Sequence, residues 1–373
     1  MPPLTVMIKP ASGLCDMRCR YCFYRDVSSR RERESYGLMP KETLEKLVKR
    51  AFLYAEHQLS FAFQGGEPTL AGKDFFRFFL SLLKKYQRPG LSVHCALQTN
   101  GLSLDGEWAD IFREGNFLIG LSLDGTEALH DLNRRTPDGR PTYGRILKSI
   151  ALLREKGVAY NILCVVTHDL ALQGKNVFEA LKEHGFLQFI PCLDSLDGAS
   201  SPYSLQKGDY GQFLCELFPL YEEALRKKAP VSIRIFDNWL GMLLGHSPES
   251  CAMCGRCANY YLCEADGSIY PCDFYVLDEW RMGNIEKDSF FKLEKSPVAA
   301  EFLQQSLDVH ENCRDCPFYS LCRGGCRRER EPRINEKLSL NRLCGDYKMF
   351  FEKYALSMQK LSAWIQKENG GTL

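Results

Sequence analysis

The sequence predicts an α/β protein, a partial (β/α)6 TIM-like barrel followed by a C-terminal cysteine-rich domain. Up to residue 228, short apolar runs alternate with amphipathic segments, which is the pattern of parallel strands covered by helices. Six such units fit into this stretch, which is too short for the eight units of a closed barrel. We expect a barrel over residues 1–228, a cysteine-rich domain over residues 229–346 and a closing helix over residues 347–373.

The predicted strands are six short apolar runs. They are LTVMIKP (4–10), LSFAFQG (59–65), LSVHCALQT (91–99), FLIGLSL (117–123), AYNILCVVT (159–167) and FLQFIPCL (186–193). The clearest helices are residues 41–57 and residues 144–157, and Gly157 is a suitable C-cap for the second. In the cysteine-rich region, ADGS (265–268) predicts a hairpin turn, and residues 347–366 have the pattern of an amphipathic helix.

Polar and glycine-rich segments follow three of the predicted strands. They are QGGEP (64–68), QTNG (98–101) and SLDG (122–125). Any one of them alone is compatible with an ordinary turn. In barrel enzymes, however, the carboxyl ends of the strands carry the active site. The three segments, together with a cysteine loop after the first strand, therefore predict a site at this edge.

Composition and charge exclude several classes of partner. The 373 residues include 48 Lys and Arg against 47 Asp and Glu, so the net charge is +1. This balance gives no reason to expect nucleic acid or an anionic membrane as a partner. The N-terminus lacks the basic and apolar segments of a secretory signal, and no apolar run is long enough to span a membrane. We expect a cytoplasmic protein.

The seventeen cysteines are the unusual feature of the composition. Three lie in residues 15–22 and ten in residues 251–344, and four are isolated: Cys95, Cys164, Cys192 and Cys215. An odd number of cysteines in a long chain without a signal favours reduced thiolates that bind metal over a disulfide framework.

The first cysteine group is C-x3-C-x2-C, formed by Cys15, Cys19 and Cys22. Three thiolates in a tight loop can hold three corners of a four-iron cluster. The fourth iron then has an open coordination position, which is a property of reactive metal sites rather than structural ones. Three accidental or buried cysteines are the alternative interpretation.

This motif, with Tyr21 before its last cysteine, resembles that of the radical S-adenosylmethionine (SAM) superfamily, and the barrel pattern extends the resemblance over residues 4–225. The resemblance implies that Cys15, Cys19 and Cys22 bind a [4Fe–4S] cluster whose open iron is chelated by SAM. It also implies a set of SAM-contacting residues. They are Tyr21, Gly65, Gly66, Glu67, Ser122, Arg134 and Leu193.

The C-terminal cysteines, with Gly267 between Cys257 and Cys272, resemble the SPASM domain, which carries two auxiliary [4Fe–4S] clusters. The resemblance assigns four ligands to each cluster. The nearer cluster has Cys251, Cys257, Cys272 and Cys326, and the farther one has Cys313, Cys316, Cys322 and Cys344. Two zinc sites are the alternative, since paired C-x2-C units also suit tetrahedral zinc. Cys254 and Cys263 have no place in the pattern, and Cys254 could replace Cys251 or Cys257 as a cluster ligand.

The match narrows to one family. SFAFQGGEPTLAG (60–72), NILCVVT (161–167) and YPCDFYVLDEWRMGNI (270–285) are similar to segments of anaerobic sulfatase-maturating enzymes. This resemblance implies a radical SAM oxidoreductase that converts a cysteine or serine in a C/S-x-P/A-x-R motif of a sulfatase to Cα-formylglycine, after a 5′-deoxyadenosyl radical removes a Cβ hydrogen. The implied partners are an unfolded or nascent sulfatase and a flavodoxin- or ferredoxin-type electron donor, and we expect a monomer.

Three further residues are expected in this reaction. Asp273, directly after Cys272, matches the proton-accepting base of the family, although a hairpin-capping aspartate would look the same. Tyr24 and Gln64 lie beside the cluster loop and the GGEP turn and are expected to contact the peptide.

Two other functions are compatible with the same motifs. One is a different SPASM peptide maturase, which would form thioether or carbon–carbon crosslinks in a small peptide. The other is a non-enzymatic zinc or iron–sulfur module. The sequence does not separate a cysteine-type from a serine-type sulfatase substrate, and it does not identify the physiological reductant.

Overall fold

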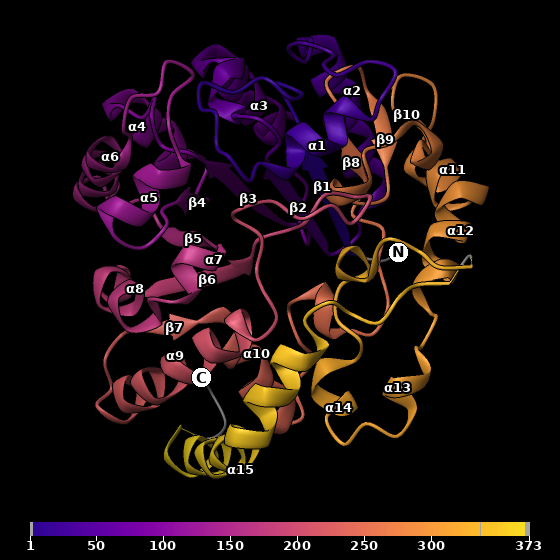
Figure 1. Ribbon diagram of the computed structural model, residues 1–373. Helices are drawn as coiled ribbons and strands as arrows, with labels where there is room; N and C mark the ends of the chain where they lie inside the picture. The colour runs from indigo at the N-terminus through magenta and orange to yellow at the C-terminus, as the bar shows by residue number, and fades with distance from the viewer. Residues whose placement is uncertain (1–2, 336, 370–373) are drawn as a thin grey trace. The chain divides into compact units, whose positions relative to one another are not determined.

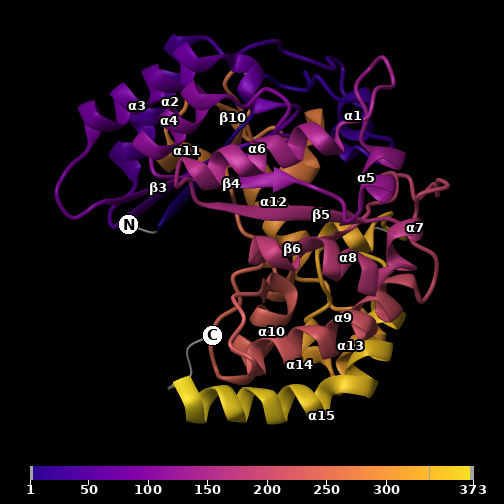
Figure 2. The same ribbon diagram turned by 90° about the vertical axis from the view of Figure 1, so that its left-hand side faces the viewer.

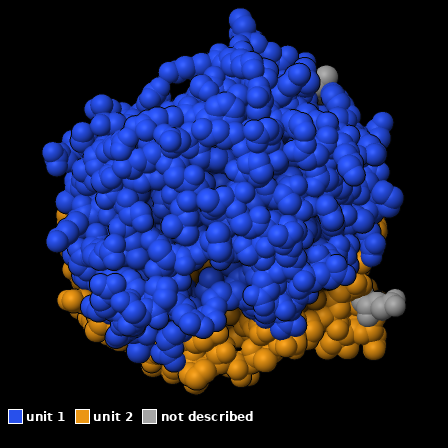
Figure 3. Space-filling view, turned by 90° about the horizontal axis from the view of Figure 1, so that it is seen from above, with its two compact units in different colours: residues 1–122, 131–160, 258–302 blue, residues 123–130, 161–257, 303–373 orange. Residues whose placement is uncertain are grey.

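The computed structural model describes residues 3–335 and 337–369 of the chain (Figure 1). The chain divides into two compact units, coloured separately in Figure 3. The first unit contains residues 1–122, 131–160 and 258–302, and the second contains residues 123–130, 161–257 and 303–373. Residues 258–302 thus group with the first strands of the barrel. The domain boundaries drawn from the motifs stay a prediction.

The first unit is built around four parallel strands that neighbour one another in chain order (Figure 1). They are β1 (Leu4–Ile8), β2 (Gln58–Phe63), β3 (Ser92–Thr99) and β4 (Phe117–Ser122). Leu4 pairs with Leu59, Phe61 with Cys95, and Cys95 with Phe117. The first four predicted strands are therefore confirmed, with parallel pairing throughout.

Helices follow each of these strands, and the last of them leads on to β5 (Tyr160–Val166). They are α2 (Lys41–Tyr54), α3 (Lys73–Tyr86), α4 (Gly106–Glu114) and α6 (Tyr143–Glu155). The core between helices and sheet is rich in aromatic rings, and Phe79 packs edge-on against Phe61 and Phe63 at centroid distances of 5.3 and 4.8 Å. Both predicted helices of this unit are confirmed, and Gly157 has the positive φ of 66° that suits a residue just past a helix end.

A short hairpin from the cysteine-rich region extends the sheet of the first unit. It consists of β8 (Leu262–Cys263) and β9 (Ser268–Tyr270), and β10 (Gly283–Asn284) follows antiparallel to β9. The predicted turn between β8 and β9 is confirmed: Gly267 has φ +82° and its N–H donates to the Glu264 carbonyl. Strand β8 pairs in parallel with β1. This pairing brings the residues that follow β9, Cys272 and Asp273, into the same unit as the first cysteine loop.

The second unit has its own parallel strands and a helical layer. Strand β5 (Tyr160–Val166), which enters this unit at residue 161, pairs with β6 (Phe186–Pro191), and β6 pairs with β7 (Ser232–Ile233). Helix α15 (Cys344–Asn369) packs on α9 (Asp209–Arg226) and α10 (Arg234–Leu243), as Figure 2 shows. The remaining predicted strands are confirmed, and the closing helix is confirmed as far as residue 369 and begins at a cysteine. Residues 370–373 of the predicted helix lie outside the described residues.

Short elements make up the rest of the described chain. They are α1 (Phe23–Ser29), η1 (Pro68–Ala71), α5 (Glu127–Asn133), α7 (His168–Ala171), α8 (Gly174–Leu181), η2 (Lys182–His184), η3 (Cys251–Met253), η4 (Asp273–Tyr275), η5 (Asp278–Trp280), α11 (Phe290–Glu294), α12 (Pro297–Ser306), α13 (Glu311–Arg314), α14 (Tyr319–Cys322) and η6 (Arg327–Arg330). Among residues 3–335 and 337–369, no helix combines the length and the apolar composition that a membrane span needs.

Candidate active site

The first cysteine group consists of Cys15, Cys19 and Cys22 and lies on the loop between β1 and α1. The backbone of this loop is fixed to the end of α5 and the residues just after it. Arg18 N–H donates to the Arg135 carbonyl at 2.7 Å, and Arg20 N–H donates to the Asn133 carbonyl at 3.0 Å. Cys15 is exposed, and Cys19 and Cys22 are partly exposed. The three thiols are therefore presented on an anchored loop at the carboxyl end of β1.

Asn100, in the QTNG segment after β3, holds the start of this loop. Its side-chain Nδ2 donates to Asp16 Oδ1 at 2.7 Å and lies 3.7 Å from Cys15 Sγ. Ser103 donates to the other Asp16 oxygen at 3.1 Å. The segments after β1 and β3 thus meet at one edge of the sheet, as the positions of the strand ends predict.

The GGEP turn after β2 lies directly against the cysteine loop. Gly66 N–H donates to the Ser12 carbonyl at 3.0 Å, and Glu67 N–H donates to the Leu14 carbonyl at 2.7 Å. A Cβ atom on Gly66 would overlap the Leu14 carbonyl oxygen, so only glycine fits at this position. The GGEP turn is therefore held by backbone hydrogen bonds directly beside the loop that carries the three thiols.

The Glu67 carboxylate is occupied by internal hydrogen bonds. It accepts from Thr69 N–H at 3.0 Å, from the Thr69 hydroxyl at 2.7 Å, from the Thr99 hydroxyl at 2.8 Å and from Asn100 N–H at 2.8 Å. Burial raises the pKa of Glu67, and these hydrogen bonds oppose the increase. The side chain ties the ends of β2 and β3 together. Its predicted contact with SAM stays a prediction, and its observed role is to shape the turn.

Arg134, another predicted SAM contact, lies beside Tyr21 and Cys19 of the same loop. The Arg134 guanidinium lies 5.3 Å from the centre of the Tyr21 ring, and its Nη1 lies 4.0 Å from Cys19 Sγ. Ser122 is the buried last residue of β4. Arg134, Tyr21 and Ser122 belong to the first unit with the cysteine loop.

Leu193 belongs to the second unit, in the loop that follows β6. Two arginines from the C-terminal part of the chain hold the residues on either side of it. Arg342 donates to the Cys192 carbonyl, and Arg328 donates to the Asp194 carbonyl. Because Arg328 lies two residues after Cys326, the segment that carries a predicted cluster ligand also fixes the Leu193 loop.

Asp273 and Tyr24 form a direct pair in the first unit. The Tyr24 hydroxyl donates to Asp273 Oδ2 at 2.7 Å. The carboxylate is 8% exposed, and its second oxygen, Oδ1, is buried and has no hydrogen-bond partner among the described residues. Burial raises the pKa of Asp273 to about 6, and the charge of Lys9 and the Tyr24 hydrogen bond oppose the increase. Asp273 therefore has one oxygen fixed and one available to accept a proton.

Gln64 lies between β2 and the GGEP turn. Its backbone N–H donates to the Ile8 carbonyl at 2.9 Å. Its side-chain Nε2 is buried and has no partner within the described ranges 3–335 and 337–369. A buried unpaired amide next to a candidate site is consistent with a ligand contact that the protein alone does not satisfy.

The auxiliary cysteines of the second unit separate into two groups. Burial raises the pKa of Cys322 to about 11, and nearby thiolates contribute to the increase; they belong to Cys344, Cys313 and Cys316. Cys326 has two other thiol neighbours, Cys251 and Cys257. The first group contains all four ligands assigned to the farther cluster, and the second contains three of the four assigned to the nearer one. The fourth, Cys272, belongs to the first unit.

Two cysteines remain outside these assignments. Cys254 is exposed, and its nearest charged neighbours include the Cys251 thiol. Cys263 is fully buried at the end of β8 and packs in the hydrophobic core of the first unit. In the part of the chain that the structure describes, no group of three or more His, Cys, Asp or Glu side chains has the arrangement to hold a single metal ion.

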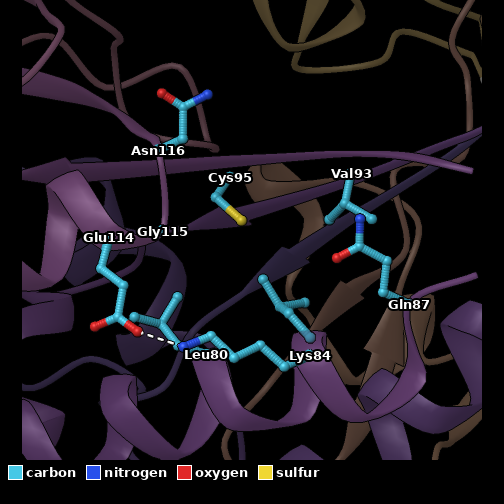
Figure 4. Close-up of a pocket in the computed structure, with 9 residues that line it drawn as sticks. Leu80, Lys84, Gln87, Val93, Cys95, Glu114, Gly115 and Asn116 are labelled. Atoms are coloured by element: carbon cyan, nitrogen blue, oxygen red, sulfur yellow. Dashed lines mark hydrogen bonds and ion pairs between the residues drawn. The ribbon is translucent and has the colours of Figure 1, made fainter.

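A cavity of about 220 Å³ lies elsewhere in the first unit (Figure 4). It is lined by α3 and by the residues around the start of β4, and its polar groups include the Lys84–Glu114 ion pair at 2.7 Å. No predicted site residue lines it. Because it adjoins the amino end of β4, and the candidate site lies at the carboxyl ends of the strands, it is separate from that site.

Comparisons with known proteins agree with this arrangement. The family model of the radical SAM superfamily matches residues 10–186, and that of an iron–sulfur cluster-binding domain, SPASM, matches residues 251–317. The chain is 44% identical over 357 residues to a cysteine-type anaerobic sulfatase-maturating enzyme of Clostridium novyi, covering 95% of this chain and 96% of the relative. It belongs to the anaerobic sulfatase-maturating enzymes.

Other relatives divide by substrate type. A cysteine-type sulfatase-maturating enzyme of Clostridium perfringens strain 13 is 44% identical, covering 94% of this chain and 96% of the relative. A serine-type sulfatase-maturating enzyme of Bacteroides thetaiotaomicron is 30% identical, covering 95% and 90%. As a member of this family, the chain is a radical SAM oxidoreductase, so the predictions of family and enzyme class are confirmed.

Solved structures confirm the fold of this sulfatase-maturating enzyme. Native anSMEcpe with bound AdoMet and the Cp18Cys peptide is 42% identical, with a TM-score of 0.93, and the match covers 98% of this chain and 100% of that one. Streptococcus suis SuiB bound to its precursor peptide SuiA is 16% identical with a TM-score of 0.63, which is a likeness of fold alone. The predicted cofactors, [4Fe–4S] clusters and SAM, are those of the family.

Several residues of the site were not predicted from the sequence. Asn100 was noted only as part of a turn, and the buried charges of Lys9, Arg31 and Glu264 were not noted at all. A signal for Lys9 and Glu264 was present, because each directly follows an apolar strand residue, where a charge is unusual.

Proposed function

We propose that this chain oxidises a cysteine or serine within a C/S-x-P/A-x-R segment of an unfolded or nascent sulfatase to Cα-formylglycine. The observation that supports this proposal most is the state of the Asp273 carboxylate. Tyr24 fixes one of its oxygens, and the other has no partner among the described residues. The alternative is a maturase that crosslinks a small peptide. The structures with 16–18% identity to this chain are likenesses of fold alone and do not support it. The relatives that are 44% identical to this chain are sulfatase-maturating enzymes.

The residues of the first unit suit the expected cofactors. Cys15, Cys19 and Cys22 would hold a [4Fe–4S] cluster with an open position. Gly65, Gly66 and Glu67, in the GGEP turn, would receive the methionine amino end of SAM. The other contacts would come from Tyr21, Ser122, Arg134 and Leu193. When bound, the cluster and SAM supply the abstraction of a hydrogen atom from Cβ of the target residue.

Asp273 would accept the proton that the substrate must lose. Formation of an aldehyde or thioaldehyde removes the proton of the substrate hydroxyl or thiol, in addition to the Cβ hydrogen. The free Oδ1 is the acceptor in this proposal, and the Tyr24 hydroxyl orients the carboxylate through Oδ2. Burial raises the pKa of Asp273 to about 6, and a base works best when its pKa lies near the working pH.

The auxiliary cysteines would hold two further [4Fe–4S] clusters, which supply one-electron acceptors when bound. We assign Cys251, Cys257, Cys272 and Cys326 to one, and Cys313, Cys316, Cys322 and Cys344 to the other. The neighbours of Cys322 and Cys326 support this division.

A cysteine substrate is favoured over a serine substrate. The support is the identity of 44% with cysteine-type relatives against 30% with serine-type relatives. Tyr24 and Gln64 are the proposed peptide contacts. We further infer that the enzyme is cytoplasmic, since reduced thiols are kept in that compartment. We also infer that it is a monomer and that it receives electrons from a flavodoxin- or ferredoxin-type donor.

An anaerobic assay tests this function. The enzyme is incubated with SAM, dithionite and a sulfatase-derived peptide that contains C-x-P-x-R, and the peptide is then analysed by mass spectrometry. Conversion of cysteine to formylglycine lowers the peptide mass by about 18 Da, and conversion of serine lowers it by about 2 Da. We expect both, with the cysteine peptide converted faster. Deoxyadenosine without any mass change would favour the crosslinking alternative, and the absence of both products would contradict the proposal.

A further inference from the structure

Lys9 is a buried cation at the end of β1. The residue is 1% exposed, and its Nζ lies 3.4 Å from Glu264 Oε2 at the end of β8. The pairing of β1 with β8 brings the two residues together, and Lys9 N–H donates to the Cys263 carbonyl at 2.9 Å. A lysine is almost never fully buried unless a carboxylate compensates its charge.

Glu264 is already neutralised by a second cation. Arg31 Nη1 donates to Glu264 Oε2 at 2.8 Å, and both side chains are fully buried. Ala265 N–H donates to the other carboxylate oxygen at 2.9 Å. Two cations therefore share one carboxylate. An uncompensated buried charge is costly, so this arrangement calls for a second carboxylate nearby.

Asp273 is the buried carboxylate that meets this need. It is 8% exposed, and its Oδ1 has no hydrogen-bond partner among the described residues. The Lys9 ammonium also lies 5.2 Å from the centre of the Tyr24 ring, which is within the range of a cation–π contact. Tyr24 in turn donates its hydroxyl to Asp273. Lys9 is thus in contact with Tyr24, and Tyr24 links it to Asp273.

The path of the Lys9 side chain is enclosed by the GGEP turn. A Cβ on Gly65 would lie 2.9 Å from Lys9 Cγ and 3.0 Å from Lys9 Cε. The stem therefore runs along the Gly65 backbone, and Glu264 fixes its charged end. This leaves the ammonium group little freedom to move away from Tyr24.

We propose that Lys9 is a positioning residue: its ammonium group, fixed by Glu264, supports the Tyr24 ring and compensates the buried Asp273 carboxylate, so that one carboxylate oxygen stays on Tyr24 and the other faces the substrate. The inference presupposes the proposed function, in which Asp273 is the proton acceptor. Lys9 itself does not touch the reacting atoms; it acts through Tyr24 and Asp273.

The test compares two substitutions that each remove one cation from Glu264. Lys9→Met keeps an unbranched stem of similar length and removes the charge beside Tyr24. Arg31→Met is the matched control, because it leaves Lys9 on Glu264 and the Arg31 guanidinium lies over the Tyr36 ring rather than Tyr24. For each variant, deoxyadenosine, formylglycine and bound iron are measured under anaerobic conditions, and a crystal structure gives the separation between Tyr24 Oη and Asp273 Oδ2.

We expect Lys9→Met to retain deoxyadenosine formation and iron, with a fall of about tenfold in formylglycine formed per deoxyadenosine. Its Tyr24–Asp273 hydrogen bond should open. Arg31→Met should leave both the product ratio and this hydrogen bond as in the wild type. Lys9→Arg, which keeps the charge, should recover part of the ratio. An unchanged ratio in Lys9→Met, or an equal fall in Arg31→Met, would overturn the proposal.

A second variant tests the proposal if Lys9→Met does not fold. The double substitution Lys9→Met/Glu264→Gln removes one charge of each sign, so the net charge of the buried groups is unchanged. A low product ratio in this folded variant supports the proposal, and a normal ratio rejects it. If the wild type forms no formylglycine, the proposed function fails, and the Tyr24–Asp273 separation in the Lys9 variants still decides whether Lys9 holds this pair.

Discussion

Glu67 and Asp273 are both buried carboxylates, but their surroundings give them different capacities. Glu67 accepts hydrogen bonds on both oxygens from Thr69, Thr99 and Asn100. Asp273 has one oxygen on Tyr24 and the other without a partner among the described residues. A carboxylate whose lone pairs are filled holds structure together, whereas one with a free oxygen can accept a proton. The environment, rather than the residue type, separates the turn-forming residue from the candidate base.

Gly66 is the residue at which the GGEP turn touches the cysteine loop. Because a Cβ there would overlap the Leu14 carbonyl oxygen, Gly66→Ala should displace this loop. We predict that deoxyadenosine formation falls by at least about tenfold, as is common when a supporting contact of a metal site is lost. Iron bound by the auxiliary cysteines should remain.

Gly144→Ala is the control for this substitution. Gly144 lies in the first turn of α6, and a Cβ there meets no atom within 4 Å. Alanine favours a helix by up to about 1 kcal/mol over glycine, so the control should be at least as stable as the wild type. Deoxyadenosine yield and iron content, measured anaerobically, check both variants. Full deoxyadenosine formation by Gly66→Ala would show that the turn tolerates a side chain.

At the level of elements, the first six strands were predictable because each is a local apolar run. Strands β8 and β9 are two and three residues long, so they carry no periodicity, and only the Asp-Gly turn marked the hairpin. The parallel pairing of β8 with β1 joins residues more than 250 positions apart, which no local pattern encodes. The contacts of Lys9, Glu264 and Asp273 all depend on this pairing.

We expect the packing of helix α15 both to stabilise the second unit and to hold Cys344 in place. Phe350 is fully buried and stacks on Trp239 at 5.1 Å, and α15 begins at Cys344. We predict that Phe350→Ala lowers the free energy of unfolding by about 3–5 kcal/mol and loosens the cluster that Cys344 is assigned to bind.

Leu356→Ala is the control on the same helix, because Leu356 is 63% exposed and its truncation should change stability by less than about 0.5 kcal/mol. Anaerobic denaturant unfolding and iron content check the pair. Equal stability of the two variants would mean that the buried face of α15 contributes little.

At the scale of the whole molecule, the cysteines were the strongest signal in the sequence. Their number and spacing indicated metal binding, but the grouping into two auxiliary clusters came from resemblance to SPASM domains, since spacing does not encode which thiols meet in space. The folded second unit brings Cys322 near the three cysteines assigned with it. Asn100 and Arg31 could not be predicted, because their functions depend on contacts between distant segments.

Iron content tests the ligand assignment. Neighbours of Cys326 include Cys251 and Cys257, the two cysteines assigned with it. We therefore predict that Cys251→Ala lowers the iron content by about four atoms per chain, the content of one [4Fe–4S] cluster. Cys254→Ala should retain the wild-type iron content. The reverse result would exchange the two cysteines in the assignment.

The most direct test of the central claim is the Asp273→Asn variant, with Glu279→Gln at an exposed position six residues later as the control. Deoxyadenosine and formylglycine are quantified together with SAM, reductant and a cysteine-containing sulfatase peptide. If Asp273 is the base, deoxyadenosine still forms while formylglycine falls by about 100-fold or more, because an amide cannot accept the proton. The control should match the wild type. Formylglycine formation by Asp273→Asn at the wild-type rate would contradict the assignment of Asp273 as the base.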